Sequence, residues 1–208
     1  MKNTFILTFL FCCYSLFGQE NCFERICKNY WNDVSENKFK DSEGKPDINK
    51  LEDWGNKTKD SLIGCKLPDF NVKTIDGKTL SLSDLKGKVV VLNFWFNSCE
   101  PCRAEIPALN RLVEDYKNTD VVFIAFSKDY EPAIKKFLEY KEFNYNIVSN
   151  DYPMEQKLCI IFGYPENMVI DRKGIVRQIF CGGPTDERAK TSAYNLMYPI
   201  INTCLKEY

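Results

Sequence analysis

The run from Val89 to Phe96 constrains the fold of this chain more than any other feature. Its residues are β-branched, aliphatic or aromatic at every position except Asn93. A strand with one face in water alternates apolar and polar residues, whereas a strand buried on both faces is apolar nearly throughout. The run therefore predicts a central strand within a sheet that is covered on both sides.

Short β runs and helices alternate on both sides of this strand. Two β runs at 70–75 and 78–82 flank Asp76-Gly77, which predicts a hairpin. The other expected strands lie at 121–126, 145–149, 168–170 and 175–180, and the expected helices at about 100–117, 131–141, 153–161 and 185–206, the last bent at Pro199. This order predicts an α/β fold with a mixed central sheet, helices on both faces and an N-terminal β-hairpin.

An extension at residues 19–60 precedes this main domain, which we expect to cover residues 61–208. Apolar residues recur at helical spacing from Phe23 to Val34 and again from Ile48 to Trp54, with a polar loop between the two segments. We expect an N-terminal helical extension that covers part of the core. A helix dedicated to docking a partner is the alternative.

The numbers of cysteine, histidine and charged residues exclude several kinds of active site and partner. The 208 residues include ten cysteines and no histidine, which removes an imidazole base, a haem-ligating histidine and any zinc site that contains histidine. The 28 Lys and Arg residues balance 29 Asp and Glu residues, so the chain as a whole has no field to hold nucleic acid or an anionic membrane. Sulfur is the first candidate for chemistry, and we expect no cofactor and no metal.

The first residues have the pattern of a secretory signal peptide. Lys2 is followed by an apolar stretch from Phe5 to Phe17 and then by small and polar residues. The stretch is too short to span a bilayer comfortably. We expect residues 1–18 to be removed on export to the periplasm or cell envelope, with a lipoprotein anchor at Cys12 or Cys13, or a short retained anchor, as the alternatives. Cleavage leaves eight of the ten cysteines in an oxidising compartment.

A pair of cysteines opens the helix that follows the central strand, in the sequence Cys99-Glu100-Pro101-Cys102. A sulfur in the first turn of a helix faces unpaired backbone N–H groups and the positive end of the helix dipole, which favours the thiolate. Cys99 is therefore the expected nucleophile. Cys102 follows one helical turn later on the same face, where it can form a disulfide with Cys99 and resolve a mixed disulfide. A purely structural disulfide or a metal clip is the alternative.

The segment from Asn93 to Pro107, with the sequence NFWFNSCEPCRAEIP, resembles the active-site segment of the thioredoxin-like TlpA/ResA family. Members of that family are extracytoplasmic thiol-disulfide oxidoreductases with a redoxin or AhpC-TSA-like domain. The resemblance covers roughly residues 64–205, including the Asp76-Gly77 hairpin and the late Tyr164-Pro165, and it implies a thioredoxin-like fold. The extension at 19–60 lies outside it.

The resemblance also implies roles for residues outside the cysteine pair. Pro165 would be a cis-proline that faces the pair, and the backbone beside it, at Tyr164, would bind an extended substrate peptide. Glu105 matches a family glutamate near the pair, so proton transfer to and from Cys102 would fall to Glu105 or to water. An ordinary solvated helix residue is the alternative for Glu105.

The sequence departs from the family pattern beside the cysteine pair and beside the proline. Ser98 stands where most relatives carry a tryptophan, which predicts a more exposed or differently selective site. Glu166 and Asn167 follow Pro165 where threonine or serine is usual, which predicts a more acidic substrate groove. Asn93 occupies the place of the buried aspartate of thioredoxin, and Trp95 is expected in the core.

The remaining cysteines of the expected mature chain have no partner that the sequence identifies. They are Cys22, Cys27, Cys65, Cys159, Cys181 and Cys204. Six cysteines allow fifteen full pairings. Structural disulfides, buried thiols and a second redox pair all stay open.

Together these features predict an extracytoplasmic thiol-disulfide oxidoreductase. The resemblance implies that it reduces protein disulfides with electrons from a membrane thiol relay, in cytochrome c maturation or in general envelope redox homeostasis. One alternative is a thiol peroxidase like the peroxiredoxins, although Leu92 and Phe96 replace the proline and threonine of that class. The other is a metal- or peptide-binding module without turnover.

Overall fold

A five-stranded mixed sheet lies at the centre of the computed structural model, which describes residues 21–149, 152–160 and 163–207. Strand β3 (Val89–Trp95) is buried at every position and lies third in the order β5-β4-β3-β6-β7. It runs parallel to β4 and antiparallel to β6. The other strands of the sheet are β4 (Val121–Ser127), β5 (Asn146–Ser149), β6 (Glu166–Ile170) and β7 (Val176–Cys181). The predicted central strand is confirmed.

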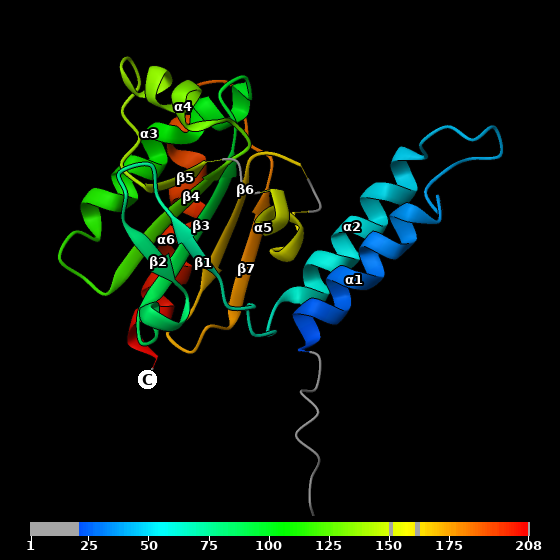
Figure 1. The fold of residues 1–208 in the computed structure, drawn as a ribbon, viewed down its shortest axis with the longest axis horizontal. Helices are drawn as coiled ribbons and strands as arrows, with labels where there is room; N and C mark the ends of the chain where they lie inside the picture. Colours follow the sequence, from blue (N-terminus) through cyan, green and yellow to red (C-terminus); the bar gives the residue numbers. More distant parts are fainter. Residues whose placement is uncertain (1–20, 150–151, 161–162, 208) are drawn as a thin grey trace, which may run out of the picture.

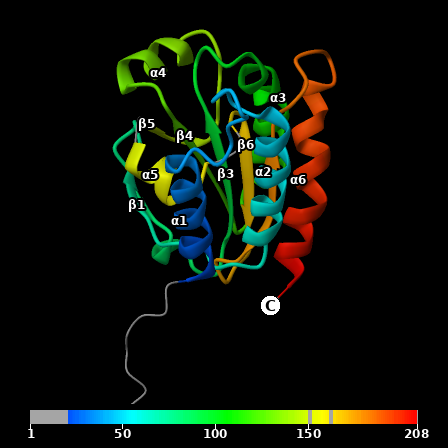
Figure 2. The ribbon, with the colours of Figure 1, turned by 90° about the vertical axis from the view of Figure 1, so that its right-hand side faces the viewer.

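The sheet is covered by a different layer on each face (Figures 1 and 2). Helices α3 (Glu100–Asp115), α4 (Glu131–Leu138) and α6 (Ala189–Lys206) cover one face. The other face is covered by the hairpin of β1 (Asn71–Lys73) and β2 (Thr79–Ser81), the short 3₁₀ helix η1 (Ser83–Leu85) and helix α5 (Tyr152–Lys157). Because side chains alternate along a strand, Val91 and Trp95 enter the first layer, whereas Leu92 and Phe94 enter the second.

The hairpin and the helix order agree with the sequence, whereas some helix ends differ. Helix α5 ends at Lys157 rather than near 161, and Cys159 follows with a φ of 60°. Helix α6 begins at Ala189 rather than near 185, because residues 182–188 form the loop that leads from β7 to it. Pro199 lies inside α6 as expected.

The N-terminal extension forms two helices that project from the sheet (Figure 1). They are α1 (Cys22–Ser35) and α2 (Ile48–Leu62), and we call residues 22–62 the arm. Helix α2 has 15 residues and is longer than the short segment expected. The arm has its own aromatic cluster, in which the Trp54 ring lies 4.9 Å from Tyr30 and 5.3 Å from Phe39.

Two disulfides attach the base of the arm to the main domain. Cys22 bonds to Cys65, and Cys27 bonds to Cys159 beyond α5. The apolar stripe of α1 also buries Phe23 completely in the core on that face of the sheet. The arm therefore covers part of the core, as the spacing of its apolar residues predicts.

The expected signal peptide at 1–18 lies outside the described residues. Within the described ranges, no helix combines the length and the apolar character that crossing a bilayer requires.

Candidate active site

The cysteine pair lies at the junction of β3 and α3. Cys99 is the N-cap residue of α3, and its Sγ accepts a hydrogen bond from the backbone N–H of Cys102 at 3.3 Å. A disulfide joins the two residues, whose Cα atoms are 5.3 Å apart. Cys99 is 6% exposed and Cys102 is 1% exposed, so the first sulfur is the more accessible one. This geometry suits attack by Cys99 and resolution by Cys102.

The segment before the cysteine pair is held by the loop between β4 and α4 and by the first turn of α4. The Asp129 carboxylate accepts a hydrogen bond from the backbone N–H of Asn97 at 2.5 Å. The side-chain amide of Asn97 donates to the carbonyl of Ala133 at 3.0 Å. Ser98 follows and is exposed. The start of α3 is thus fixed while its outer side stays open.

The cis-proline predicted at Pro165 is present, because the Tyr164–Pro165 peptide bond is cis. The carbonyl of Pro165 accepts a hydrogen bond from the backbone N–H of Gly182 at 2.8 Å. The ring of Tyr164 packs edge-on against Phe96 at 5.2 Å, and the ammonium of Lys128 lies 5.1 Å from its centroid. Because Phe96 belongs to the segment before Cys99, these contacts place the proline loop beside the cysteine pair.

Glu105 is buried at 4% exposure, so its interpretation as a solvated helix residue is wrong. It lies one turn after Cys102 on the same helix, where residues i and i+3 share a face. Its Oε1 accepts hydrogen bonds from the side-chain amides of Asn93 at 3.0 Å and Asn167 at 3.3 Å. Burial raises the pKa of Glu105 to about 8, although these hydrogen bonds lower it. A carboxyl group with a pKa near neutrality can both accept and release a proton.

A cavity of about 10 Å³, large enough for about one water molecule, adjoins Glu105. Asn167, Gly183 and Ser192 also line it. A Cβ atom on Gly183 would lie 3.9 Å from Oε2 of Glu105 and 4.0 Å from Cγ of Pro165. The loop after β7 therefore packs directly against both the buried carboxyl group and the cis-proline.

Sequence reasoning missed two neighbours of Glu105. Asn167, which the sequence places in the substrate groove, is 2% exposed and lies opposite Asn93 in the β3–β6 ladder. Its side-chain carbonyl accepts a hydrogen bond from Asn93 Nδ2 at 2.9 Å. Tyr145 is the other neighbour; burial first, and the charge of Glu105 second, raise the pKa of its hydroxyl well above the usual value. A strand's period of two marks which residues share a face, but not which strands become neighbours.

The expectation of a more acidic substrate groove fails at Glu166. Its side chain is completely buried, because β6 lies between β3 and β7 and is covered on both faces. Its charge instead raises the pKa of Tyr30 in the arm, where burial is the larger cause. Because side chains alternate along β6, Glu166 lies on the same face as Met168 and Ile170, which belong to the core beneath the hairpin and α5.

The described cysteines outside the pair fall into two groups. Four form the two disulfides that hold the arm, which excludes most of the pairings left open. The other two carry thiols: Cys204 is buried in α6, and Cys181 is exposed at the end of β7. Burial raises the pKa of Cys204 to about 11. Although part of Cys181 is exposed, partial burial and then the charge of Glu166 raise the pKa of its thiol to about 12. Neither is therefore a ready thiolate at neutral pH.

Comparison with known proteins places this arrangement in a family. The family model described as AhpC/TSA matches residues 63–179. The "Thioredoxin-like protein YneN" of Bacillus subtilis is 33% identical over 125 residues, which cover 59% of this chain and 73% of that protein. The "Thiol-disulfide oxidoreductase ResA" of Bacillus anthracis is 35% identical over 130 residues, which cover 61% of this chain and 73% of that protein.

Solved structures show the same fold. The thioredoxin domain of a thiol-disulfide oxidoreductase from Bacteroides vulgatus superposes with a TM-score of 0.56 at 26% identity, over 67% of this chain and 98% of that one. A thiol:disulfide interchange protein from Bacteroides sp. gives a TM-score of 0.55 at 26% identity, over 67% and 90% of the two chains. Since the matched region contains the cysteine pair, Glu105 and Pro165, this chain belongs to the AhpC/TSA family and is a thiol-disulfide oxidoreductase with a thioredoxin-like fold.

Proposed function

We propose that this protein reduces protein disulfides outside the cytoplasm through Cys99 and Cys102. The observation that carries the proposal is the disulfide at the N-terminus of α3, beside a cis-proline and a buried carboxyl group. Export is supported by the signal-peptide pattern at 1–18 and by the two disulfides of the arm, which persist in an oxidising compartment.

The reaction begins with the reduced pair. The thiolate of Cys99 attacks one sulfur of the substrate disulfide, a mixed disulfide forms, and the other substrate sulfur leaves as a thiol after taking up a proton. Cys102 then loses its proton and attacks Cys99, which expels the second substrate thiol and closes the Cys99–Cys102 disulfide. Glu105 accepts the proton of Cys102, since it is the carboxyl group one turn away on the same face of α3.

The substrate peptide lies along the Tyr164–Pro165 segment. An extended peptide adds to an exposed backbone in the manner of an extra strand, and side-chain pockets then set its specificity. Phe96, Tyr164 and Lys128 form a surface beside that segment. The exposed Ser98 leaves this side of the cysteine pair open to a bulky substrate.

For the physiological role, the proposal rests on the resemblance to the TlpA/ResA family. Electrons reach the oxidised pair from a membrane thiol relay, and the substrates belong to cytochrome c maturation or to general envelope redox homeostasis. Residues 1–18 are removed on export, residues 19–60 form the extension, and residues 61–208 form the catalytic domain.

Replacing the nucleophile tests the proposed chemistry. Cys99→Ser is expected to abolish reduction of a disulfide-bonded peptide, because Cys102 is too buried to attack it. Cys102→Ser is expected to accumulate the mixed disulfide, which mass spectrometry detects as a covalent adduct on Cys99. Retained turnover in Cys99→Ser, with circular dichroism unchanged, would contradict the assignment. Peroxide consumption by a variant that keeps only Cys99 of the pair would favour a peroxidase instead.

A further inference from the structure

The edge of the molecule opposite the cysteine pair carries a large cavity that the thiol chemistry does not use. It has a volume of about 460 Å³, which lies in the usual range for ligand pockets. Its lining comes from four separated parts of the chain: the start of α1, the segment after α2, the segment that leads from β2 into β3, and the turn between β6 and β7. A second cavity of about 220 Å³ shares Lys86, Asp171, Arg172 and Lys173 with it.

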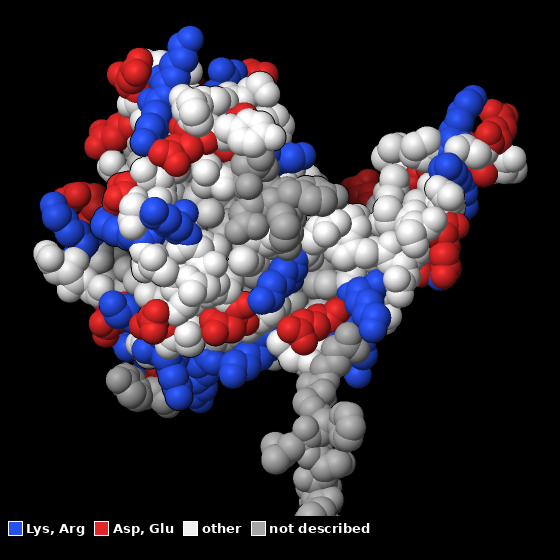
Figure 3. Space-filling model, in the orientation of Figure 1, with Lys and Arg blue, Asp and Glu red and all other residues white. Residues whose placement is uncertain are grey.

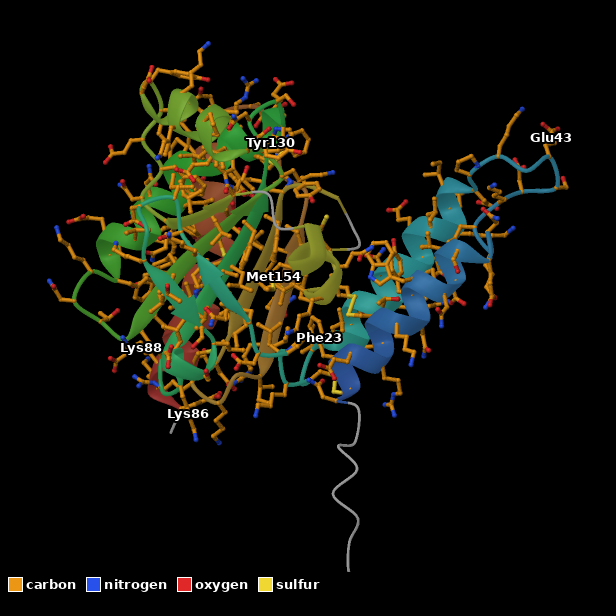
Figure 4. The ribbon with its side chains drawn as sticks, viewed as in Figure 1. Phe23, Glu43, Lys86, Lys88, Tyr130 and Met154 are labelled. Carbon is orange, nitrogen blue, oxygen red and sulfur yellow. A yellow bond between two sulfur atoms is a disulfide. The ribbon has the colours of Figure 1, made fainter. Side chains whose placement is uncertain are left out.

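Four lysines line the larger cavity, and they are Lys66, Lys86, Lys88 and Lys173. All four are exposed, and none of them forms an ion pair with another described residue. Figure 3 shows Lys and Arg side chains gathered along the lower edge of the main domain. In Figure 4, Lys86 and Lys88 lie at this edge.

The acidic residues of the cavity mainly hold its walls. Asp69 accepts hydrogen bonds from the backbone N–H groups of Phe70 at 3.0 Å and Ser83 at 2.9 Å. Asp171 accepts from the backbone N–H groups of Lys173 at 2.8 Å and Ile175 at 3.0 Å. The third, Glu24, lies in the first turn of α1. Five basic and three acidic side chains line the cavity, so its net charge is positive and favours an anion.

The interior of the cavity is apolar. Leu67, Leu85 and Val90 line it and are almost completely buried, and Leu82 and Pro68 lie beside them. A ligand that fits both the lysines and the apolar interior has an acidic head group and an apolar body. A phosphate group joined to glycerol and acyl chains has that composition.

The position of the cavity on the fold indicates where such a ligand would be. Lys88 precedes β3 and Cys99 follows its other end, so the strand of seven residues separates them by about 23 Å at about 3.3 Å per residue. Tyr130, which follows the Asp129 that holds the Cys99 segment, lies at the upper edge in Figure 4. Asn21 lines the cavity, so the described chain begins at the lysine edge.

We propose that this edge binds anionic phospholipid at a membrane surface. Clusters of four to eight basic residues beside an apolar segment indicate binding of acidic lipid headgroups, and four lysines line this one cavity above its apolar interior. Binding there leaves Cys99 on the opposite edge, turned away from the bilayer and open to a protein substrate. The overall charge balance does not oppose this, because the field that matters is local within a Debye length of about 8–10 Å.

Vesicle binding tests the proposal on the exported protein. Wild type is expected to sediment with phosphatidylglycerol–phosphatidylcholine vesicles but not with phosphatidylcholine vesicles, and to dissociate as salt rises. Lys86→Gln/Lys88→Gln should weaken binding about 30-fold, because each lysine at an anionic surface contributes about 1 kcal/mol. The matched control is Lys40→Gln/Lys136→Gln, which makes the same change in net charge at exposed lysines elsewhere and should bind like wild type.

A soluble probe tests the cavity itself. Dihexanoyl-phosphatidylglycerol below its micelle concentration is expected to shift the methyl NMR signals of Leu67 and Leu85, whereas glycerol phosphate is not. Equal loss of vesicle binding in the control variant would overturn the proposal, as would binding of glycerol phosphate without any binding to vesicles. Disulfide reduction by Lys86→Gln/Lys88→Gln should equal that of wild type, so failure here leaves the proposed function intact.

Discussion

Glu105 shows how one buried side chain links stability to chemistry. Its carboxyl group is held by Asn93 and Asn167, and burial keeps its pKa near 8. A raised carboxyl pKa means that the folded state holds a proton that the unfolded chain has already released. The fold is therefore most stable, with respect to this group, below the unfolded pKa of 4.5, and it loses stability as the pH rises towards 8.

Glu105→Gln should remove this pH dependence, because glutamine does not titrate and its carbonyl can still accept from both asparagines. Between pH 5 and 8, the free energy of unfolding of wild type should fall relative to the variant by up to about 1.4 kcal/mol per pH unit. Denaturant unfolding of the oxidised proteins at several pH values measures the difference. Parallel pH profiles would show that Glu105 ionises freely in the fold.

The position of Cys99 and Cys102 at the start of α3, and their disulfide, could be predicted because both depend on local sequence. Two sulfurs one helical turn apart at the start of a helix need no distant partner to be identified. The Asn93–Asn167 pair could not be predicted, since it depends on the register between β3 and β6. The burial of Glu105 could not be predicted either, because the pattern of apolar residues along a helix does not show which elements cover each of its faces.

The arm is an element held mainly by covalent bonds at its base. Helices α1 and α2 pack on each other through their aromatic cluster, while Cys22–Cys65 and Cys27–Cys159 join them to the main domain. The side chain of Trp31 adds a hydrogen bond to the carbonyl of Gln156 at 3.4 Å. The Cys27–Cys159 bond is the one that fixes α1 to the region beyond α5, across 132 residues of sequence.

Removing that bond should destabilise the protein. Cys27→Ala/Cys159→Ala is expected to lower the free energy of unfolding by about 2–4 kcal/mol, because the unfolded chain regains the freedom that the crosslink removes. Guanidinium unfolding under non-reducing conditions measures this. Cys204→Ala controls for the loss of a buried sulfur atom outside the disulfides and should cost less. An equal cost in the control would mean that the crosslink adds nothing.

The helices of the arm could be predicted from their apolar spacing, whereas their attachment could not. Fifteen pairings were open, and the spacing of cysteines along the chain does not select one. The cationic cavity could not be predicted from the sequence either. Its lysines come from positions 66, 86, 88 and 173, which only the fold brings together.

At the scale of the whole molecule, the disulfides differ in what they connect. The two arm disulfides join segments 43 and 132 residues apart, whereas the Cys99–Cys102 disulfide closes a loop of one helical turn. We expect that opening the short one leaves the fold unchanged, whereas opening the two long ones releases the base of the arm. A thiol-disulfide oxidoreductase needs this division, because its exchanging pair must cycle while its structural bonds stay closed.

The most direct test of this division is a glutathione redox titration in which mass spectrometry follows every cysteine by differential alkylation. We expect Cys99 and Cys102 to change together, as one two-electron couple, while Cys22–Cys65 and Cys27–Cys159 stay oxidised throughout the glutathione range. Cys181 and Cys204 should stay as thiols. Reduction of either arm disulfide before the Cys99–Cys102 pair, or a pair that resists reduction altogether, would contradict the central claim.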